Sequence, residues 1–259
     1  MKTELLQFNN KKGDILRGIL VLNNEQNKEI LLMVGGFEGP ATTQKKFKVL
    51  VDNIEFSSFR LDYTGIGISD GDFSKLTVKD LSLDIKAAIE ELNNRGFNKI
   101  YIVCHSLSAC AISSLVEHFD KIILMAPALN QKELARYWFV QSLNEKQGFA
   151  KEINWNNYKQ YLNEQDFLRD CKRNDKMTSM NNILSDYFME NIDKDYSSLF
   201  VDFQDRVFHV HGLNDDVVPL ESMTVNFNNH IFIEKGDHDL ERPDMIEKWF
   251  ESTIKFIIK

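Results

Sequence analysis

Short apolar runs alternate with helical patterns along most of this chain, and the alternation restricts the folds that the chain can adopt. The apolar runs predict strands at residues 5–8, 15–22, 30–34, 54–61, 100–104, 121–125, 206–210 and 231–234, the first two forming a hairpin. Helical spacing of apolar residues predicts helices at 43–52, 77–96 and 107–119, and from Pro243 onward. Strict alternation of strand and helix implies right-handed crossovers. We therefore expect an α/β fold with a mostly parallel sheet.

The alternation lapses between residues 128 and 205, where helical stretches occur without a convincing strand. We interpret residues 1–127 and 206–259 as an α/β core and residues 128–205 as a helical lid inserted into it. The lid is rich in aromatic side chains, which form either the core of a helical subdomain or a surface for substrate. These residues are Tyr137, Trp138, Phe139, Phe149, Trp155, Tyr158, Tyr161, Phe167, Tyr187 and Phe188.

The composition fits a globular protein with a substantial core, because 43% of the 259 residues are hydrophobic and 27% are charged. A net charge of -8 argues against a sequence-independent nucleic-acid binder, which needs clustered basic residues. Cys104, Cys110 and Cys171 have no paired spacing, so we interpret them as core fillers and expect a cytoplasmic protein. We expect no secretory signal, since polar residues interrupt the first ten positions, and no membrane-spanning helix, since no apolar run is long enough.

The apolar run at 100–104 leads into Ser106, which is followed by small, helix-forming residues. A serine between a buried strand and a helix is typical of a nucleophile on a sharp turn, which lifts Oγ out of the sheet edge. The plainer alternative is a serine that only caps the helix. Two later segments favour the nucleophile, because they supply an acid and a base.

Asp215 and His238 each follow a predicted strand. The carboxyl ends of parallel strands meet at one edge of a sheet, so both side chains are expected to lie near Ser106. A serine hydroxyl is a weak nucleophile that needs an imidazole to accept its proton and a carboxylate to orient that imidazole. His238 and Asp215 can fill these roles. Asp216 is the alternative to Asp215, and the competing interpretation makes both ordinary turn residues.

Six segments of the chain resemble those of the α/β-hydrolase superfamily. They are the glycine loop Gly35-Gly36-Phe37-Glu38-Gly39, the stretch from Arg60 to Gly71, the Ser106 turn, Met125-Ala-Pro127, the Asp215 loop and the His238 loop. In order and spacing the chain is most similar to small bacterial carboxylesterases with a helical lid, including those that cleave cinnamoyl-type esters. The resemblance covers nearly the whole chain apart from the inserted segment. It implies the α/β-hydrolase fold, with Ser106, Asp215 and His238 as a catalytic triad.

Acyl transfer also needs backbone donors for the oxyanion of the transition state. The resemblance implies that these are the amide of Leu107, directly after the serine, and the amide of Phe37 in the glycine loop. The chain departs from the family pattern at two places. Gly35 stands where a histidine is common, so we expect other hydrogen bonds to hold the glycine loop. Cys104 and Ser108 replace the glycines that flank the nucleophile, and both side chains are small enough to fit there.

We expect a serine hydrolase that cleaves a carboxylic ester or thioester of a small to medium acyl group, including an aromatic one, through an acyl-enzyme on Ser106. The expected partner is a small-molecule substrate, free or bound to a carrier, and neither a metal nor an organic cofactor is implied. Three alternatives stay open. They are an acyltransferase or acyl-carrier thioesterase on the same scaffold, a haloperoxidase-like or lyase chemistry, and a non-catalytic binding protein derived from a hydrolase.

Other polar positions have structural interpretations. His105, next to the serine, is expected to pack rather than react. His209 and His211 are expected to be structural rather than zinc ligands, because no cysteine or carboxylate is placed to complete a site. Residues 62–67 are glycine-rich but match neither phosphate-binding glycine pattern, so we interpret them as a structural loop.

Overall fold

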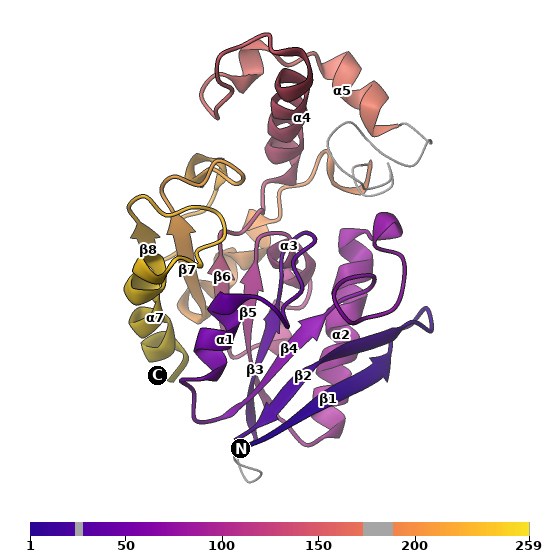
Figure 1. Cartoon of the computed structure of the whole chain (residues 1–259), viewed down its shortest axis with the longest axis vertical. Helices are drawn as coiled ribbons and strands as arrows, with labels where there is room; N and C mark the ends of the chain where they lie inside the picture. The colour runs from indigo at the N-terminus through magenta and orange to yellow at the C-terminus, as the bar shows by residue number, and fades with distance from the viewer. Residues whose placement is uncertain (24–27, 173–188, 259) are drawn as a thin grey trace.

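The computed structural model describes residues 1–23, 28–172 and 189–258. Its centre is an eight-stranded sheet with the order β1-β2-β4-β3-β5-β6-β7-β8 (Figure 1). β2 pairs antiparallel with β1 and with β4, and every other neighbouring pair is parallel. The predicted α/β class with a mostly parallel sheet is therefore confirmed. The strands are β1 (Lys2–Asn9), β2 (Ile15–Leu22), β3 (Glu29–Val34), β4 (Ser57–Asp62), β5 (Lys99–His105), β6 (Lys121–Met125), β7 (Val207–Gly212) and β8 (Asn229–Ile233).

Helices cover both faces of the sheet. Side chains of α2 and α3 belong to one apolar cluster, and side chains of α1 and α7 belong to a second. Along β3, Ile30 and Leu32 join the first cluster while Leu31 and Met33 join the second, as expected for a strand buried on both faces. The helices are α1 (Lys45–Val51), α2 (Val78–Asn94), α3 (Ser108–Ile112), α4 (Gln131–Gln147), α5 (Glu164–Cys171) and α7 (Pro243–Ile258), with short 3-10 helices η1 (Phe73–Lys75), η2 (Val116–His118), η3 (Tyr158–Gln160), η4 (Ser197–Arg206) and η5 (Leu220–Ser222).

Two predicted elements differ from the structure. The strand expected at 54–61 begins only at Ser57, because the carbonyls of Ile54 and Phe56 accept hydrogen bonds from the Asn23 side chain rather than from a neighbouring strand. The single helix expected over 107–119 is wrong, since α3 ends at Ile112 and η2 follows after a turn. At the break, the Ser113 hydroxyl donates to the Cys110 carbonyl at 2.7 Å, a local bond that competes with helical pairing.

Between β6 and β7, the described residues contain α4, η3, α5 and η4 and no strand. α4 and α5 lie beyond the ends of the strands, above the sheet in Figure 1. Several aromatic side chains of this region pack on one another: the rings of Tyr137 and Tyr158 lie 5.4 Å apart, and those of Phe139 and Phe167 lie 5.6 Å apart. Tyr187 and Phe188 lie outside the described residues. The division into a core and a lid at residues 128–205 stays a prediction.

None of the described helices combines the length and the apolar character that crossing a membrane requires.

Candidate active site

Ser106 lies on a sharp turn between β5 and α3. Its φ angle is 54°, in the left-handed region that non-glycine residues rarely adopt, and its amide donates to the Met125 carbonyl on β6 at 2.9 Å. A residue keeps this conformation only when its surroundings impose it, and such positions cluster at functional sites. The strand–turn–helix setting predicted for Ser106 is thus present in the backbone.

Ser108 takes the place of a family glycine and adds a contact that glycine lacks. Its buried hydroxyl lies 3.1 Å from the Val34 carbonyl at the end of β3 and 3.0 Å from the His105 carbonyl. Because both are acceptors, the single hydroxyl proton is shared between them, and the side chain connects the Ser106 turn to the neighbouring strand. Cys104, at the other family-glycine position, is fully buried. Both departures from the family pattern therefore fit into a closely packed turn.

The glycine loop, residues 35–39, passes directly beside Ser106. A Cβ atom placed on Gly36 would lie only 2.9 Å from the Ser106 Cβ, and one on Gly35 would overlap the Gly39 carbonyl oxygen. The Tyr63 hydroxyl donates to the Gly36 carbonyl at 2.6 Å, and the Gly39 amide donates to the same oxygen at 3.2 Å. Tyr63 and tight backbone packing thus hold the loop in a chain that has Gly35 where the family has a histidine.

Asp215 lies in the loop after β7, with its side chain fully buried. Its Oδ1 accepts hydrogen bonds from the amides of Val217 and Val218 at 3.0 and 2.8 Å, and its Oδ2 lies 2.8 Å from His238 Nδ1. Asp216 is exposed, so Asp215 is the carboxylate that contacts the imidazole. Since a carboxylate accepts, Nδ1 carries the proton and the neutral His238 ring has a free lone pair on Nε2.

The His211 imidazole also lies close to the Asp215 carboxylate. Its Nε2 lies 2.7 Å from the Val218 carbonyl and 3.4 Å from Asp215 Oδ2, so Nε2 must be the protonated nitrogen. Its Nδ1 then accepts from His209 Nε2 at 2.9 Å. Burial of Asp215 raises its pKa, but the hydrogen bonds from His211 and His238 outweigh burial and lower the pKa to about 2. Asp215 is therefore ionised at neutral pH, and His209 and His211 are bonded to each other within the core.

This arrangement makes stability depend on pH. The pKa of Asp215 is about 2 in the folded chain, against 3.8 for an unperturbed aspartate. A carboxylate with a lowered pKa stabilises the fold above its unfolded pKa, and this contribution, about 2 kcal/mol, is lost as the pH falls from about 4 to about 2. We expect the difference in free energy of unfolding between wild type and D215N to shrink by about that amount over this range. Urea unfolding at several pH values measures it, and a difference that does not change with pH would contradict the assignment.

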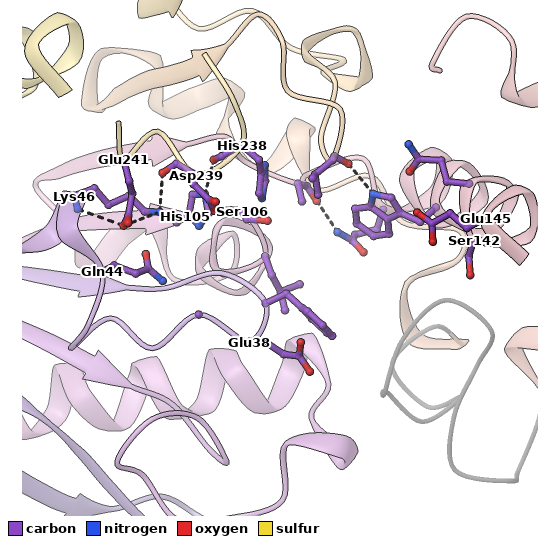
Figure 2. Close-up of a pocket in the computed structure, with 18 residues that line it drawn as sticks. Glu38, Gln44, Lys46, His105, Ser106, Ser142, Glu145, His238, Asp239 and Glu241 are labelled. Carbon is purple, nitrogen blue, oxygen red and sulfur yellow. Dashed lines mark hydrogen bonds and ion pairs between the residues drawn. The ribbon is translucent and has the colours of Figure 1, made fainter. Parts of the chain in front are cut away.

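Ser106 and His238 line one cavity of about 620 Å³, together with Phe37, Leu107 and Trp138. In Figure 2 the Ser106 and His238 side chains lie next to one another on its wall. Neither Ser106 Oγ nor His238 Nε2 has a hydrogen-bond partner among the residues that the structure describes. Both atoms are therefore available for contact with a molecule in the same cavity. Catalytic hydrogen bonds are often long or poorly aligned before substrate binds, so the lack of a bond between these two atoms does not contradict the predicted triad. The roles of Ser106, Asp215, His238, Phe37 and Leu107 stay predictions.

Backbone strain concentrates around this cavity. In the described part of the chain, each non-glycine residue with a positive φ lies at the carboxyl ends of the strands or in the loops that follow them. These residues are Glu38, Ser106, Ala126, Lys235 and Leu240. They belong to the glycine loop, the serine turn, the end of β6 and the two sides of the His238 loop, so strained backbone surrounds the predicted site.

One end of the cavity is polar in a way that the sequence did not reveal. Lys46, on α1, is 1% exposed and lines the cavity with Gln44, Asp239 and Glu241 (Figure 2). Lys46 stands between Lys45 and Phe47, close to a third lysine at 48, and such a cluster in a short helix normally indicates a solvated face. The spacing of residues in the sequence does not distinguish the buried Lys46 from the exposed Lys45 and Lys48.

No protein-family model and no curated protein matches this sequence. Solved structures do match over nearly the whole chain. Est1E from Butyrivibrio proteoclasticus, solved with bound ferulic acid, is 19% identical with a TM-score of 0.69, and the match covers 98% of this chain and 100% of Est1E. An esterase from Pyrococcus furiosus is 14% identical with a TM-score of 0.67, covering 99% of this chain and 90% of that one. A proline iminopeptidase-related protein from Thermus thermophilus is 16% identical with a TM-score of 0.67, covering 100% and 99%.

Proposed function

Because this chain has the α/β-hydrolase fold, as predicted, we propose that its cavity is the active site of a serine hydrolase acting on carboxylic esters or thioesters. One observation carries the proposal. The imidazole of His238, bonded through Nδ1 to the buried Asp215, faces a cavity that it shares with a serine in the left-handed conformation. This is the set of groups that acyl transfer through a serine needs.

In the proposed reaction, Ser106 Oγ attacks the carbonyl carbon of the substrate while His238 Nε2 takes the hydroxyl proton. Asp215 keeps the His238 proton on Nδ1 and stabilises the imidazolium that forms. The tetrahedral intermediate then collapses, His238 protonates the leaving alkoxide or thiolate, and an acyl-enzyme remains on Ser106. Water, deprotonated by His238, hydrolyses that ester and restores the serine.

The oxyanion of the tetrahedral intermediate would be bound by the amides of Phe37 and Leu107. The close approach of Gly36 to Ser106 supports this role, since it brings the glycine loop against the nucleophile. The hydrogen bond from Tyr63 to the Gly36 carbonyl fixes the peptide plane directly before Phe37. Preorganised donors of this kind contribute about 10²- to 10³-fold each to turnover.

We propose a small to medium acyl group, with an aromatic one among the candidates. A cavity of about 620 Å³ has room for such a group together with part of an alcohol. Trp138 of α4 lines the cavity, and its Nε1 donates to the Val217 carbonyl at 2.6 Å, which fixes the ring in place. The ferulic acid bound by the structurally similar Est1E is also an aromatic acid.

A fluorophosphonate probe tests the proposal directly, because it reacts with a serine only where a base activates it. We expect stoichiometric modification of Ser106, identified by peptide mass spectrometry, and no modification of the S106A variant. The S114A variant is the matched control, since Ser114 is exposed on the same segment and should leave labelling unchanged. A folded wild-type protein that resists the probe would overturn the hydrolase assignment and favour a binding protein.

A further inference from the structure

Three consecutive backbone carbonyls in the His238 loop each accept a hydrogen bond from a side chain of a different element. His105, at the end of β5, donates from Nε2 to the His238 carbonyl at 2.9 Å. Lys46, on α1, donates from Nζ to the Asp239 carbonyl at 2.9 Å. Trp249, on α7, donates from Nε1 to the Leu240 carbonyl at 3.0 Å. We call these three side chains the carbonyl clamp.

Lys46 is the unusual member of the carbonyl clamp. Lysine is almost never fully buried unless it is paired, and this side chain is 2% exposed. Its Nζ lies 3.5 Å from Glu241 Oε1, and the same carboxylate oxygen accepts from the Lys46 amide at 3.3 Å. Burial lowers the pKa of the ammonium despite this partner. A purely space-filling role would be met at lower cost by an aliphatic residue, so the buried donor itself needs an explanation.

The position of Lys46 in the chain suggests that explanation. α1 follows closely after the glycine loop, so Lys46 connects that side of the cavity to the His238 loop. His105 directly precedes the nucleophile and connects the serine turn to the same loop. Ser108 joins the serine turn to the end of β3, where the glycine loop begins. Hydrogen bonds thus join the His238 loop to α1 and to the serine turn, and the serine turn to the end of β3. The chain itself, which runs from β3 through the glycine loop to α1, closes the circuit.

We infer that Lys46 is a positioning residue, which holds the Asp239 carbonyl so that His238 keeps its place relative to Ser106 and the glycine loop. The inference rests on the proposed function. It predicts an effect on the chemical step rather than on substrate binding, because a general base displaced by a fraction of an ångström transfers protons poorly. The competing role for a cavity lysine is to bind an anionic substrate, but the Nζ atom already faces Asp239 and Glu241.

The test compares K46M with K48M on a neutral 4-nitrophenyl ester. Methionine keeps the approximate length of lysine and removes the donor. Lys48 lies two positions further along α1, is exposed and pairs with Asp52, so K48M removes a lysine that the carbonyl clamp does not use. We expect kcat of K46M to fall about 10- to 100-fold with little change in KM, and K48M to match wild type within about twofold. Titration with a fluorophosphonate gives the concentration of active sites in each sample.

Chemical rescue separates positioning from a general loss of structure. Alkylation of the K46C variant with 2-bromoethylamine rebuilds an ammonium of lysine length, and we expect kcat to recover at least about tenfold relative to unmodified K46C. Wild type treated in the same way is the control for alkylation of other residues. If K46M does not fold, the comparison of K46C before and after alkylation tests the inference in its place.

A readout that needs no turnover is the low-field NMR signal of the His238 Nδ1 proton bonded to Asp215. We expect this signal to broaden or shift in K46M and to stay unchanged in K48M. An unchanged kcat and signal in K46M would overturn the inference, and so would a rise in KM alone. A wild-type protein that neither turns over esters nor reacts with the probe would instead overturn the proposed function, while the NMR comparison would still decide whether Lys46 positions the imidazole.

Discussion

The H238A variant is expected to lose about 10⁴-fold or more in kcat/KM for an activated ester such as a 4-nitrophenyl ester. Alanine removes the Nε2 lone pair that would accept the Ser106 proton, so the serine stays a neutral, weak nucleophile. Substrate binding should change little, because the cavity and its other walls remain. Initial rates measured over a range of ester concentrations give kcat and KM, and the rate of fluorophosphonate labelling should fall in parallel.

The matched control is H118A. His118 is an exposed histidine in η2, far in sequence from the His238 loop, and its loss should leave kcat/KM within about twofold of wild type. If H238A kept most of the wild-type rate while remaining folded, another base would have to serve Ser106 and the proposed triad would be wrong.

The D215N variant is expected to lose about 10⁴-fold in kcat at neutral pH. An asparagine can offer its NH₂ group to His238 Nδ1, which favours the tautomer with the proton on Nε2, where it cannot accept from Ser106. It also removes the negative charge that stabilises the imidazolium. The measurement is kcat for the same ester, with circular dichroism to verify that the variant is folded.

D216N is the control for this substitution, because Asp216 is the exposed neighbour of Asp215 and the alternative candidate for the acid. We expect D216N to stay within about twofold of wild type, as is usual for a surface substitution. A large loss in D216N together with a small loss in D215N would reverse the assignment of the acid.

The order of the elements could be predicted from local pattern because β3, β5 and β6 are continuous apolar runs and α2 has apolar residues at helical spacing. The Thr77 cap was also predictable, since a threonine followed three residues later by an aspartate forms the capping box that the structure contains. The residue at which β4 begins and the residue at which α3 ends could not be predicted. They depend on side chains that compete for backbone groups, those of Asn23 and Ser113, and apolar periodicity carries no information about such bonds.

At the candidate site, the sequence indicated Ser106, Asp215 and His238 because each follows a strand, and parallel strands present their carboxyl ends at one edge. The resemblance to α/β-hydrolases favoured Asp215 over Asp216, and the structure places Asp215 beside the imidazole. The carbonyl clamp could not be found in this way. Lys46 and its acceptor at Asp239 are 193 positions apart, and only the packing of α1 against the last loop brings them together.

Ser108 has a consequence for how chains of this kind are recognised. The usual signature of a serine elbow asks for glycine on both sides of the nucleophile, and this chain would fail that search twice. Its backbone nevertheless makes the sharp bend at Ser106. At the position where the signature has glycine, the Ser108 hydroxyl is hydrogen-bonded to the end of β3. A structural search for a residue with left-handed dihedral angles between a buried strand and a helix would find divergent chains that a search for the sequence motif misses.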